Sequence, residues 1–383
     1  MEEEYSSTTE LHSESSPNTE IVTICIDNYR IEDGHLNKHV VYLISGQDQS
    51  GVFQSARRYK EFKVLRTLLI LNWPICPIPK LPKKKAVGNL NKDLIHKRKK
   101  LLDYFIGKVV SYNFLYKSEA FQLFIRNPSD FIKSSKSITA CSFIQMAESM
   151  KKNLEVSENF QGTESHSEVV KSFYGLLEDG LRRVKALKKT CKKNVLSFYR
   201  YEDGLAHLSL GIGQVSQHFF QNIGVLEVLQ KKASNPYKVL LDWARREAVE
   251  IEAKLESIDK KEYLESVLAK SQARLSKQQQ ELESFQGGKR GLMQKLRKKN
   301  DEEAGKELEG HVASTESEIL ALKKIISISV DRLINYLIPM FRDKEIEKFE
   351  GTIRCYAGVV VDEYNEFKAY FSGVQDVIKP PTL

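Results

Sequence analysis

Residues 53–71 read FQSARRYKEFKVLRTLLIL and contain a change from a strand pattern to a helix pattern. Before the change, Val52 and Phe53 end an alternating apolar run; after it, apolar residues recur at the three- and four-residue steps of a helix. Arg57, Arg58 and Tyr59 lie at the junction. Arginine can hold a phosphate through two parallel N–H bonds, and a ring beside it can lie flat against a sugar-like face. The same residues alone also fit an exposed basic strand end, so the rest of the chain has to distinguish the two.

The bulk composition predicts a soluble chain with more than one structured unit. Its 383 residues exceed the usual size of a single domain. Hydrophobic residues make up 41% and charged residues 29%, and no apolar run is long enough to span a bilayer. The five cysteines are scattered without metal-ligand spacing, so reduced thiols are expected.

The net charge of +8 is distributed unevenly. Residues 1–20 are acidic, contain no Lys or Arg, and have little that can pack, which predicts a disordered tail rather than a signal or transit peptide. Residues 80–100 and 289–299 are densely basic. This pattern indicates an anionic partner, either a membrane or a nucleic acid.

Residues 21–128 combine short strands with helices. The predicted elements are strands at 21–26, at 39–44 and from residue 51, a helix ending near Asn72, a second beginning near Asn91, and a third around 118–126. Between the first two helices, residues 73–82 contain four prolines. Prolines at this density exclude a helix or an inner strand, so we expect an extended segment that crosses the surface.

Three motifs in this order resemble those of the phox-homology (PX) domain family. They are Arg57-Arg58-Tyr59-x-x-Phe62, the Pro-rich crossing followed by lysines, and Ile95-x-x-Arg98-x-x-x-Leu102-x-x-Phe105. The resemblance implies an α+β PX domain, with a three-stranded sheet plus helices, over residues 21–128. It also implies that this domain binds phosphatidylinositol 3-phosphate.

The same resemblance implies a role for each residue of the site. By position, Arg58 would hold the 3-phosphate of the lipid, and Tyr59 would stack beneath the inositol ring. Lys84 would contact the 1-phosphate, and Arg98 would hold the ring hydroxyls on the opposite side. Arg57 would then be a neighbour that faces solvent.

Two positions in this assignment stay open. Three lysines follow the Pro-rich crossing, so the lysine that faces the lipid is any of Lys83, Lys84 and Lys85. Lys97 precedes Arg98, and a slip of one residue would put a lysine in the role of the arginine.

The loop beyond these lysines has a small apolar tip. Ala86, Val87 and Leu90 either dip into the membrane interface or fold back onto the domain. Lys83, Lys85, Val87 and Leu90 are therefore candidate membrane contacts.

Residues 129–165 read as a connecting segment. Residues 134–137 have the composition of a linker, and the apolar residues within 138–154 permit one amphipathic helix. Two placements of this helix stay open: it lies in the membrane surface, or it packs against the helices that follow.

From residue 166 to residue 378 the apolar residues follow helical steps, and strand patterns are almost absent. We expect three long helices. Gly211 and Gly213 mark the expected break in the first, since two glycines cost a helix roughly 2 kcal/mol relative to alanine. Pro236 either kinks a helix or starts a new one, and Pro339 is expected to bend the last.

Three helices of this length form an antiparallel rod on the order of 100 Å at 1.5 Å per residue. One rod leaves apolar faces uncovered near its middle, so a dimer is expected. This architecture resembles an all-α BAR domain of three long, kinked antiparallel helices over residues 166–378. A PX domain followed by such helices resembles the PX-BAR sorting nexins. That resemblance implies a homo- or heterodimer on endosomes, with retromer-like complexes or cargo proteins as further partners.

The turn between the second and third long helices is strongly basic. Its cations are Lys289, Arg290, Lys295, Arg297, Lys298 and Lys299. Each cation near an anionic bilayer contributes about 1 kcal/mol to binding, which makes this turn a candidate membrane contact. The alternative is a solvated helix end that complements the helix dipole.

Motifs of nucleotide-binding, metalloprotease, serine-hydrolase and kinase sites are absent, so we expect no catalysis, cofactor or metal. Aromatic residues do not interleave with the basic stretches, which disfavours nucleic acid. The sequence therefore predicts a cytoplasmic protein that binds phosphatidylinositol 3-phosphate on the cytosolic face of endosomes, dimerises, and senses or generates curvature in endosomal sorting. The alternative is a coiled-coil scaffold that its PX domain localises to endosomes and that does not remodel membranes.

Overall fold

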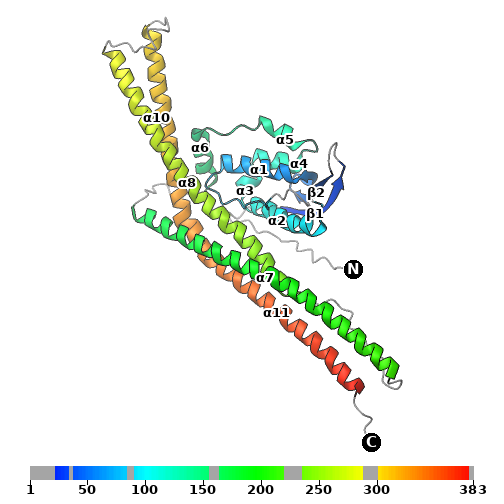
Figure 1. Cartoon of the computed structure of the whole chain (residues 1–383). Coiled ribbons are helices and arrows are strands. Elements are labelled where there is room, and N and C mark those ends of the chain that lie inside the picture. The colour runs from blue at the N-terminus through cyan, green and yellow to red at the C-terminus, as the bar shows by residue number, and fades with distance from the viewer. Residues whose placement is uncertain are drawn as a thin grey trace. The chain divides into compact units, whose positions relative to one another are not determined.

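The computed structural model describes residues 22–33, 38–83, 90–154, 164–219, 235–287 and 301–378 (Figure 1). The chain divides into two compact units. The first unit comprises Met1–Leu177 and Val249–Leu337, and the second comprises Glu178–Ala248 and Ile338–Leu383. The long helices pass from one unit to the other, whereas all three strands belong to the first.

The first unit contains an antiparallel sheet in the order β1-β2-β3. Its strands are β1 (Thr23–Glu32), β2 (His39–Asp48) and β3 (Gly51–Arg58). The predicted strands are confirmed in place and are longer than the pattern suggested. Gly51 follows the tight turn between β2 and β3 with a φ of 108°, a conformation that favours glycine. The antiparallel hairpin brings the end of β3 to the start of the first helix.

Six short or medium helices follow the sheet within the first unit. They are α1 (Tyr59–Asn72), α2 (Lys92–Val110), α3 (Asn113–Tyr116), α4 (Glu119–Arg126), α5 (Phe131–Ser134) and α6 (Phe143–Asn153), with a 3-10 turn η1 (Ser135–Ser137) after α5. The starts predicted for α2 and α4 are confirmed. Asn91 and Ser118 cap these two helices, because each side-chain oxygen accepts a backbone N–H from the first turn.

Aromatic side chains form the centre of the first unit. Phe62 of α1 packs edge-on against Tyr42, Phe105 and Phe124, with ring centroids 5.0–6.5 Å apart. Each of these rings is fully buried. The core therefore joins the sheet to α1, α2 and α4, and it fixes where the first turn of α1 lies.

The Pro-rich segment between α1 and α2 is extended, as predicted, but it does not simply cross the surface. Cys76, Ile78 and Pro79 are buried. Arg66 of α1 donates to the carbonyls of Ile78 and Pro79, at 3.0 and 2.9 Å. Proline has no N–H, so a Pro-rich segment contains few backbone donors. The side chain of Arg66 donates the hydrogen bonds that two carbonyls of the segment accept.

Helix α6 packs against the long helices of the first unit. Met146, Ala147 and Met150 are buried, and Glu148 forms an ion pair of 2.9 Å with Lys324. Of the two placements left open for residues 138–154, the structure has the packed one.

Three long helical runs complete the chain and confirm the expected helical part. They are α7 (Glu164–Phe219), α8 (Tyr237–Gln286), and a third run made of α10 (Asp301–Arg332), the π-helix η2 (Leu333–Leu337) and α11 (Ile338–Ile378). In the second unit α8 runs antiparallel to α11, since Tyr237 lies against Tyr356 and Trp243 against Phe349. Among the described residues, no helix combines the length and the apolar character needed to cross a bilayer.

The break expected at Gly211 and Gly213 is wrong, because α7 continues through both residues. Two glycines cost only about 2 kcal/mol, and a contact on the same stretch opposes fraying: the hydroxyl of Ser209, which is buried, bonds that of Tyr370 on α11. Pro236 immediately precedes α8, so it starts a helix. The irregularity expected at Pro339 takes the form of η2, because proline has no N–H to donate to the carbonyl four residues earlier.

Candidate functional site

The candidate site begins where β3 ends. Arg58 is the last residue of β3 and the N-cap of α1, and its backbone N–H donates to the carboxylate of Glu61 at 2.7 Å. Its guanidinium group is half-buried and has no hydrogen bond or ion pair with any residue that the structure describes. An unpaired cation at the positive end of a helix is poised for an anionic ligand.

Arg98 of α2 lies over the ring of Tyr59, the residue that follows Arg58. Its guanidinium carbon lies 4.8 Å from the centroid of the Tyr59 ring. Arg98 is only 5% exposed because it lies on the same helical stripe as Ile95 and Leu102, both in the core. Within the described part of the chain, its Nε and Nη2 atoms have no hydrogen-bond partner. These two atoms form one edge of the guanidinium group, the edge that binds a carboxylate, phosphate or pair of hydroxyls with two parallel bonds.

Tyr42 is a third polar group at this place, and the sequence did not single it out. Strand β2 pairs Tyr42 with Arg57, next to Arg58, and its ring packs under Phe62 in the first turns of α1. The side chain is fully buried, and its hydroxyl faces Arg98 without a hydrogen bond of regular geometry to any described residue. Burial raises the pKa of Tyr42, and Arg98 opposes that rise through its charge and through its approach to the hydroxyl. In the sequence, Tyr42 lies in an apolar strand pattern and looks like an ordinary core residue. Only the structure shows that its buried hydroxyl lacks a regular hydrogen bond among the described residues.

Tyr59 connects the site to the Pro-rich segment. Its hydroxyl donates to the carbonyl of Pro82. Burial raises the pKa of Tyr59, and the Arg98 cation opposes that rise. We call the side chains of Arg58, Tyr59 and Arg98 the cup.

The remaining predicted lipid contacts are only partly described. Lys83 and Leu90 are exposed, and Leu90 is 40% exposed. Lys84, Lys85 and Val87 lie outside the described residues. Lys97 is exposed whereas Arg98 is buried against Tyr59, which favours the arginine over the one-residue slip.

The prediction for Arg57 is wrong, because Arg57 does not face solvent. It is 2% exposed and donates to the carbonyls of Phe124, at 2.7 Å, and Asn127 at the end of α4. Burial lowers its pKa. The reason is the two-residue period of a strand: Phe53, Ser55 and Arg57 point inward, so the adjacent arginine points elsewhere. Arg57 therefore caps the end of α4, whereas the guanidinium group of Arg58 stays available to a ligand.

The second predicted contact region, the basic turn, lies outside the described residues. That holds for Lys289, Arg290, Lys295, Arg297, Lys298 and Lys299. The structure describes α8 up to Gln286 and α10 from Asp301.

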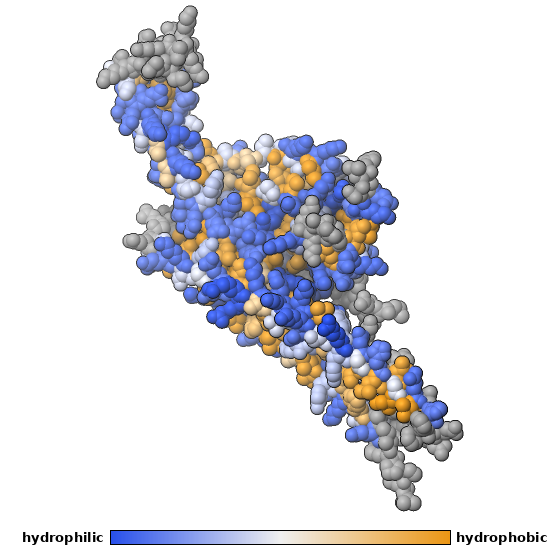
Figure 2. All heavy atoms as spheres, in the orientation of Figure 1, coloured by the Kyte–Doolittle hydropathy of each residue, from blue (hydrophilic) through white to orange (hydrophobic). Residues whose placement is uncertain are grey.

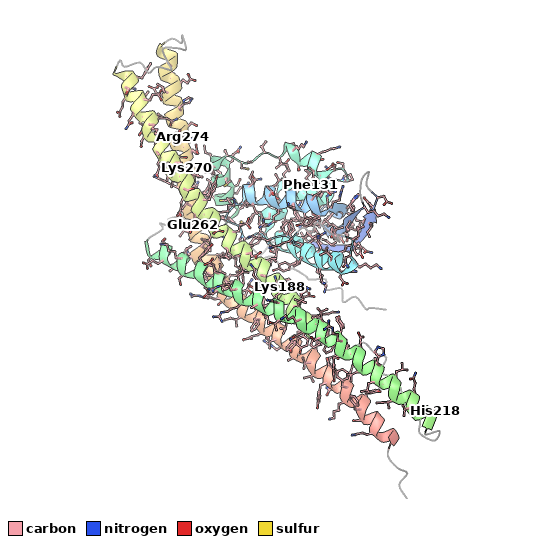
Figure 3. All side chains as sticks on the ribbon, viewed as in Figure 1. Phe131, Lys188, His218, Glu262, Lys270 and Arg274 are labelled. Atoms are coloured by element: carbon pink, nitrogen blue, oxygen red, sulfur yellow. The ribbon has the colours of Figure 1, made fainter. Side chains whose placement is uncertain are left out.

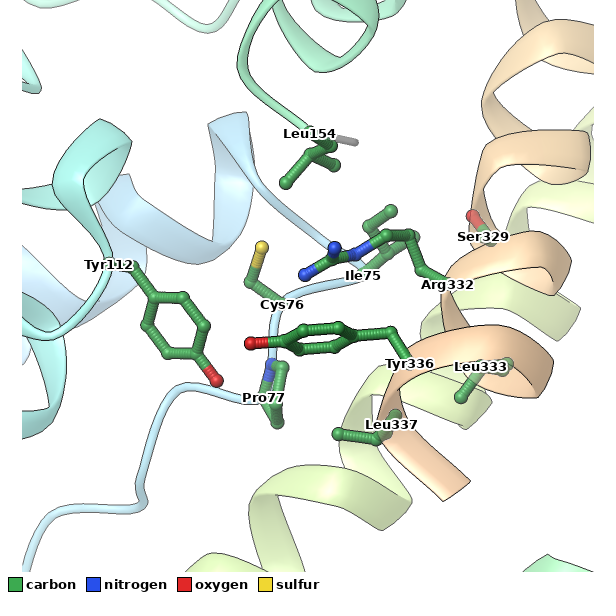
Figure 4. Close-up of a pocket in the computed structure, with 10 residues that line it drawn as sticks. All are labelled: Ile75, Cys76, Pro77, Tyr112, Leu154, Ser329, Arg332, Leu333, Tyr336 and Leu337. Carbon is green, nitrogen blue, oxygen red and sulfur yellow. The ribbon is translucent and has the colours of Figure 1, made fainter. Parts of the chain in front are cut away.

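A small cavity lies beside the Pro-rich segment, where η2 meets it in the first unit (Figure 4). Arg332 stacks on Tyr336 with its guanidinium carbon 3.8 Å from the ring centroid, and both point toward Cys76. Burial raises the pKa of the Cys76 thiol to about 12, which makes it unreactive at neutral pH. The cavity measures about 30 Å³, room for about two water molecules, so it is a packing feature.

Comparison with known proteins agrees with this geometry. The PX domain model matches residues 46–128, so the part of the chain that carries the cup is a PX domain. Human sorting nexin-11 is 30% identical over 121 residues, which cover 30% of this chain and 45% of that protein. The vacuolar protein sorting-associated protein vps5 of Schizosaccharomyces pombe is 30% identical over 107 residues, which cover 25% of this chain and 19% of that protein. The matched region thus spans less than half the length of either relative.

The likeness to a solved structure extends over nearly the whole chain. A chain of the SNX-BAR Mvp1 tetramer aligns with a TM-score of 0.56 and 15% identity, covering 90% of this chain and 99% of its own. At this identity the likeness concerns the fold. Residues 46–128 are thus a PX domain, and the fold of the chain, with long helices after this domain, is similar to that of the SNX-BAR structure, as the order of motifs and helices predicted.

Proposed function

We propose that this protein is a non-catalytic peripheral membrane protein that docks on phosphatidylinositol 3-phosphate through the cup. The observation that supports the proposal is the buried edge of Arg98, which makes no regular hydrogen bond with any described residue and lies beside the ring of Tyr59, the residue that follows Arg58. Leaving buried donors unpaired costs about 1–3 kcal/mol each. A ligand rich in acceptors removes that cost, and binding energy is therefore concentrated at these two arginines.

The chemistry of the lipid headgroup suits the cup. A phosphomonoester carries nearly two negative charges and accepts bidentate bonds from arginine. We assign the 3-phosphate to Arg58, the inositol ring to the face of Tyr59, and the ring hydroxyls to Arg98. Lys84 is assigned to the 1-phosphate, with Lys83 and Lys85 as neighbours on the membrane.

The helical part supports a dimer. Figure 2 shows apolar patches on the part of the surface formed by α7 and α11. The exposed apolar side chains of the second unit on these helices are Leu196, Tyr201, Leu208, Leu210, Ile212 and Val215 on α7, and Ile346, Phe349, Ile353, Val360, Val361, Tyr364 and Phe371 on α11. Exposed apolar surface on this scale is typical of an interface. The solved neighbour is itself a tetramer, which supports assembly.

From these parts we infer a role in endosomal sorting. The cup selects membranes that contain the lipid. A dimer raises the overall affinity for such a membrane, because once one cup has bound, the second cup binds at high effective concentration. Such a dimer, homo- or heteromeric, would sense or generate curvature on the cytosolic face of endosomes, with the basic turn as a further contact. Retromer-like complexes or cargo proteins are the partners that this role implies.

One observation favours a second candidate, a scaffold that binds endosomes without remodelling them. Helix α6 buries Met146 and Met150 against the long helices, so its apolar side is not available for insertion into a membrane. Purified protein that binds vesicles but never tubulates them, at any concentration, would support the scaffold.

The test is co-sedimentation with vesicles that contain or lack phosphatidylinositol 3-phosphate. We expect Arg58→Ala and Arg98→Ala to abolish the preference for this lipid while the dimer persists. Lys97→Ala is the matched control, since it removes an exposed cation next to Arg98. If the arginine variants still prefer the lipid, the site assignment is wrong. If all variants lose binding equally, binding depends on charge alone.

A further inference from the structure

One carboxylate of the long helix α8 contacts the PX domain through an arginine. Arg66 of α1 places Nη2 at 2.7 Å and Nη1 at 3.4 Å from the two oxygens of Glu256. Both side chains are largely buried, at 16% and 25% exposed, so solvent screens the pair less than a surface pair. Lys80 of the Pro-rich segment also approaches Glu256, at 3.8 Å. Glu256 thus neutralises two cations of the PX domain.

The same guanidinium group holds the Pro-rich segment. Its Nε atom donates to the carbonyl of Pro79 at 2.9 Å, and Nη2 donates to the carbonyl of Ile78 at 3.0 Å. Arg66 therefore joins three acceptors: two carbonyls of the segment and the carboxylate of Glu256. Because the fork of a guanidinium group is rigid, moving one acceptor away disturbs the others.

The Pro-rich segment continues from this anchor to the cup. Pro82, three residues after Pro79, accepts the hydroxyl of Tyr59, and the ring of Tyr59 faces Arg98. Prolines fix the backbone φ angle, so a segment with this composition behaves as a stiff spacer rather than a flexible loop. Where the segment is anchored near Pro79 therefore sets where Pro82 and Lys83 lie.

We propose that Glu256 is a positioning residue of the lipid site: it orients Arg66, and through the Pro-rich segment it holds Tyr59 in place for the headgroup. This proposal rests on the proposed function of the cup. It means that the helical part of the chain contributes to headgroup affinity without touching the lipid. By the reciprocity of linked equilibria, headgroup binding should in turn stabilise the contact at Glu256.

The test compares Glu256→Ala and Glu256→Asp with Glu262→Ala in the full chain. Glu262 lies on the same helix, is exposed, and serves as the control for removal of one negative charge (Figure 3). Two measurements are made: affinity for phosphatidylcholine vesicles that contain phosphatidylinositol 3-phosphate, and amide hydrogen exchange without lipid at the non-proline residues of 78–83, which are Ile78, Lys80, Leu81 and Lys83. We expect Glu256→Ala to weaken lipid-selective binding about threefold and to speed exchange in residues 78–83. Glu256→Asp should restore part of both, and Glu262→Ala should change neither.

The outcomes separate this inference from the proposed function. Wild-type protein that shows no preference for the lipid overturns the function of the cup. Wild-type preference together with unchanged affinity of Glu256→Ala, or with an equal loss in Glu262→Ala, overturns only the positioning role. A loss of affinity with no change in exchange of residues 78–83 also overturns it, because the segment would not then transmit the effect.

Discussion

The guanidinium group of Arg98 lies over the ring of Tyr59, 4.8 Å from its centroid, while one edge of the same group makes no regular hydrogen bond with any residue that the structure describes. Stacking uses the flat face of the guanidinium and leaves its in-plane N–H groups free. The ring therefore holds the cation in place without consuming the donors that a ligand needs. A buried arginine in this state is costly to the protein without a ligand, and a ligand that accepts from this edge would remove the cost.

The first prediction concerns Tyr42. Tyr42→Phe removes a buried hydroxyl that makes no regular hydrogen bond within the described part of the chain, and it leaves the ring packed on Phe62. We expect the free energy of unfolding to stay unchanged or to rise by up to about 1 kcal/mol, because a desolvation cost disappears. We expect affinity for the lipid to fall about twofold to fivefold. Urea unfolding and vesicle binding measure the two; a destabilised variant with normal binding would show that Tyr42 serves only the core.

The second prediction concerns Arg98. Arg98→Met replaces a buried, unpaired cation with an apolar side chain of similar length. We expect the protein to be at least as stable as wild type, by analogy with other buried charges replaced by apolar residues. Lipid-selective binding should be lost. A thermal unfolding curve shifted to lower temperature would contradict the view that the edge of Arg98 is unsatisfied.

The third prediction concerns Arg57, for which we expect a loss of stability, in contrast to Arg98. Arg57→Met leaves the carbonyls of Phe124 and Asn127 without their donor. We expect a loss of about 2–4 kcal/mol in the free energy of unfolding, since two buried acceptors become unpaired. Arg58→Met, with a half-buried and unpaired side chain, should stay within about 0.5 kcal/mol of wild type. Equal stability of the two variants would refute the division of roles between these arginines.

The fourth prediction concerns pH. Burial alone would raise the pKa of Asp48, but hydrogen bonds from Tyr116, Arg126 and the backbone of Ser50 outweigh it and lower the pKa below the usual value. A lowered pKa in the folded state gives stability that is present above the unfolded pKa, about 3.9, and is lost as pH falls below it. We expect Asp48→Asn to be less stable than wild type at pH 7, with a difference that shrinks toward pH 3. Urea midpoints measured across this range test the sign; a difference that grows on acidification would contradict it.

The fifth prediction concerns assembly. Val361 and Leu208 are exposed apolar residues on α11 and α7, at 55% and 57% exposure. We expect the double variant Leu208→Asp/Val361→Asp to shift the protein from dimer to monomer, because buried charges at an apolar interface are costly. Asn365→Asp adds a charge at an exposed polar position of α11 and is the control. Sedimentation velocity reports the state, and a variant that remains dimeric would place the interface elsewhere.

Local pattern was enough to find the elements and most of the cup. The change from two-residue to helical periodicity placed the end of β3 and the start of α1, and with them Arg58 and Tyr59. Asparagine and serine caps placed the starts of α2 and α4, and helical spacing put Arg98 in line with the core residues Ile95 and Leu102. These are properties of short stretches, and sequence reports them directly.

Tertiary structure decided what covers each face. Strand alternation separates Arg57 from Arg58, but only the position of α4 shows that Arg57 is the buried one. Tyr42 became a candidate because its buried hydroxyl makes no regular hydrogen bond with any described residue, and Glu256 because it meets Arg66 across 190 residues of sequence. The amphipathic stretch that becomes α6 permitted a membrane or a protein surface as its partner, and the chain covers it with its own helices. The periodicity of a sequence indicates which side of a helix or strand is apolar. Which element covers that side depends on packing between segments that lie far apart in the chain.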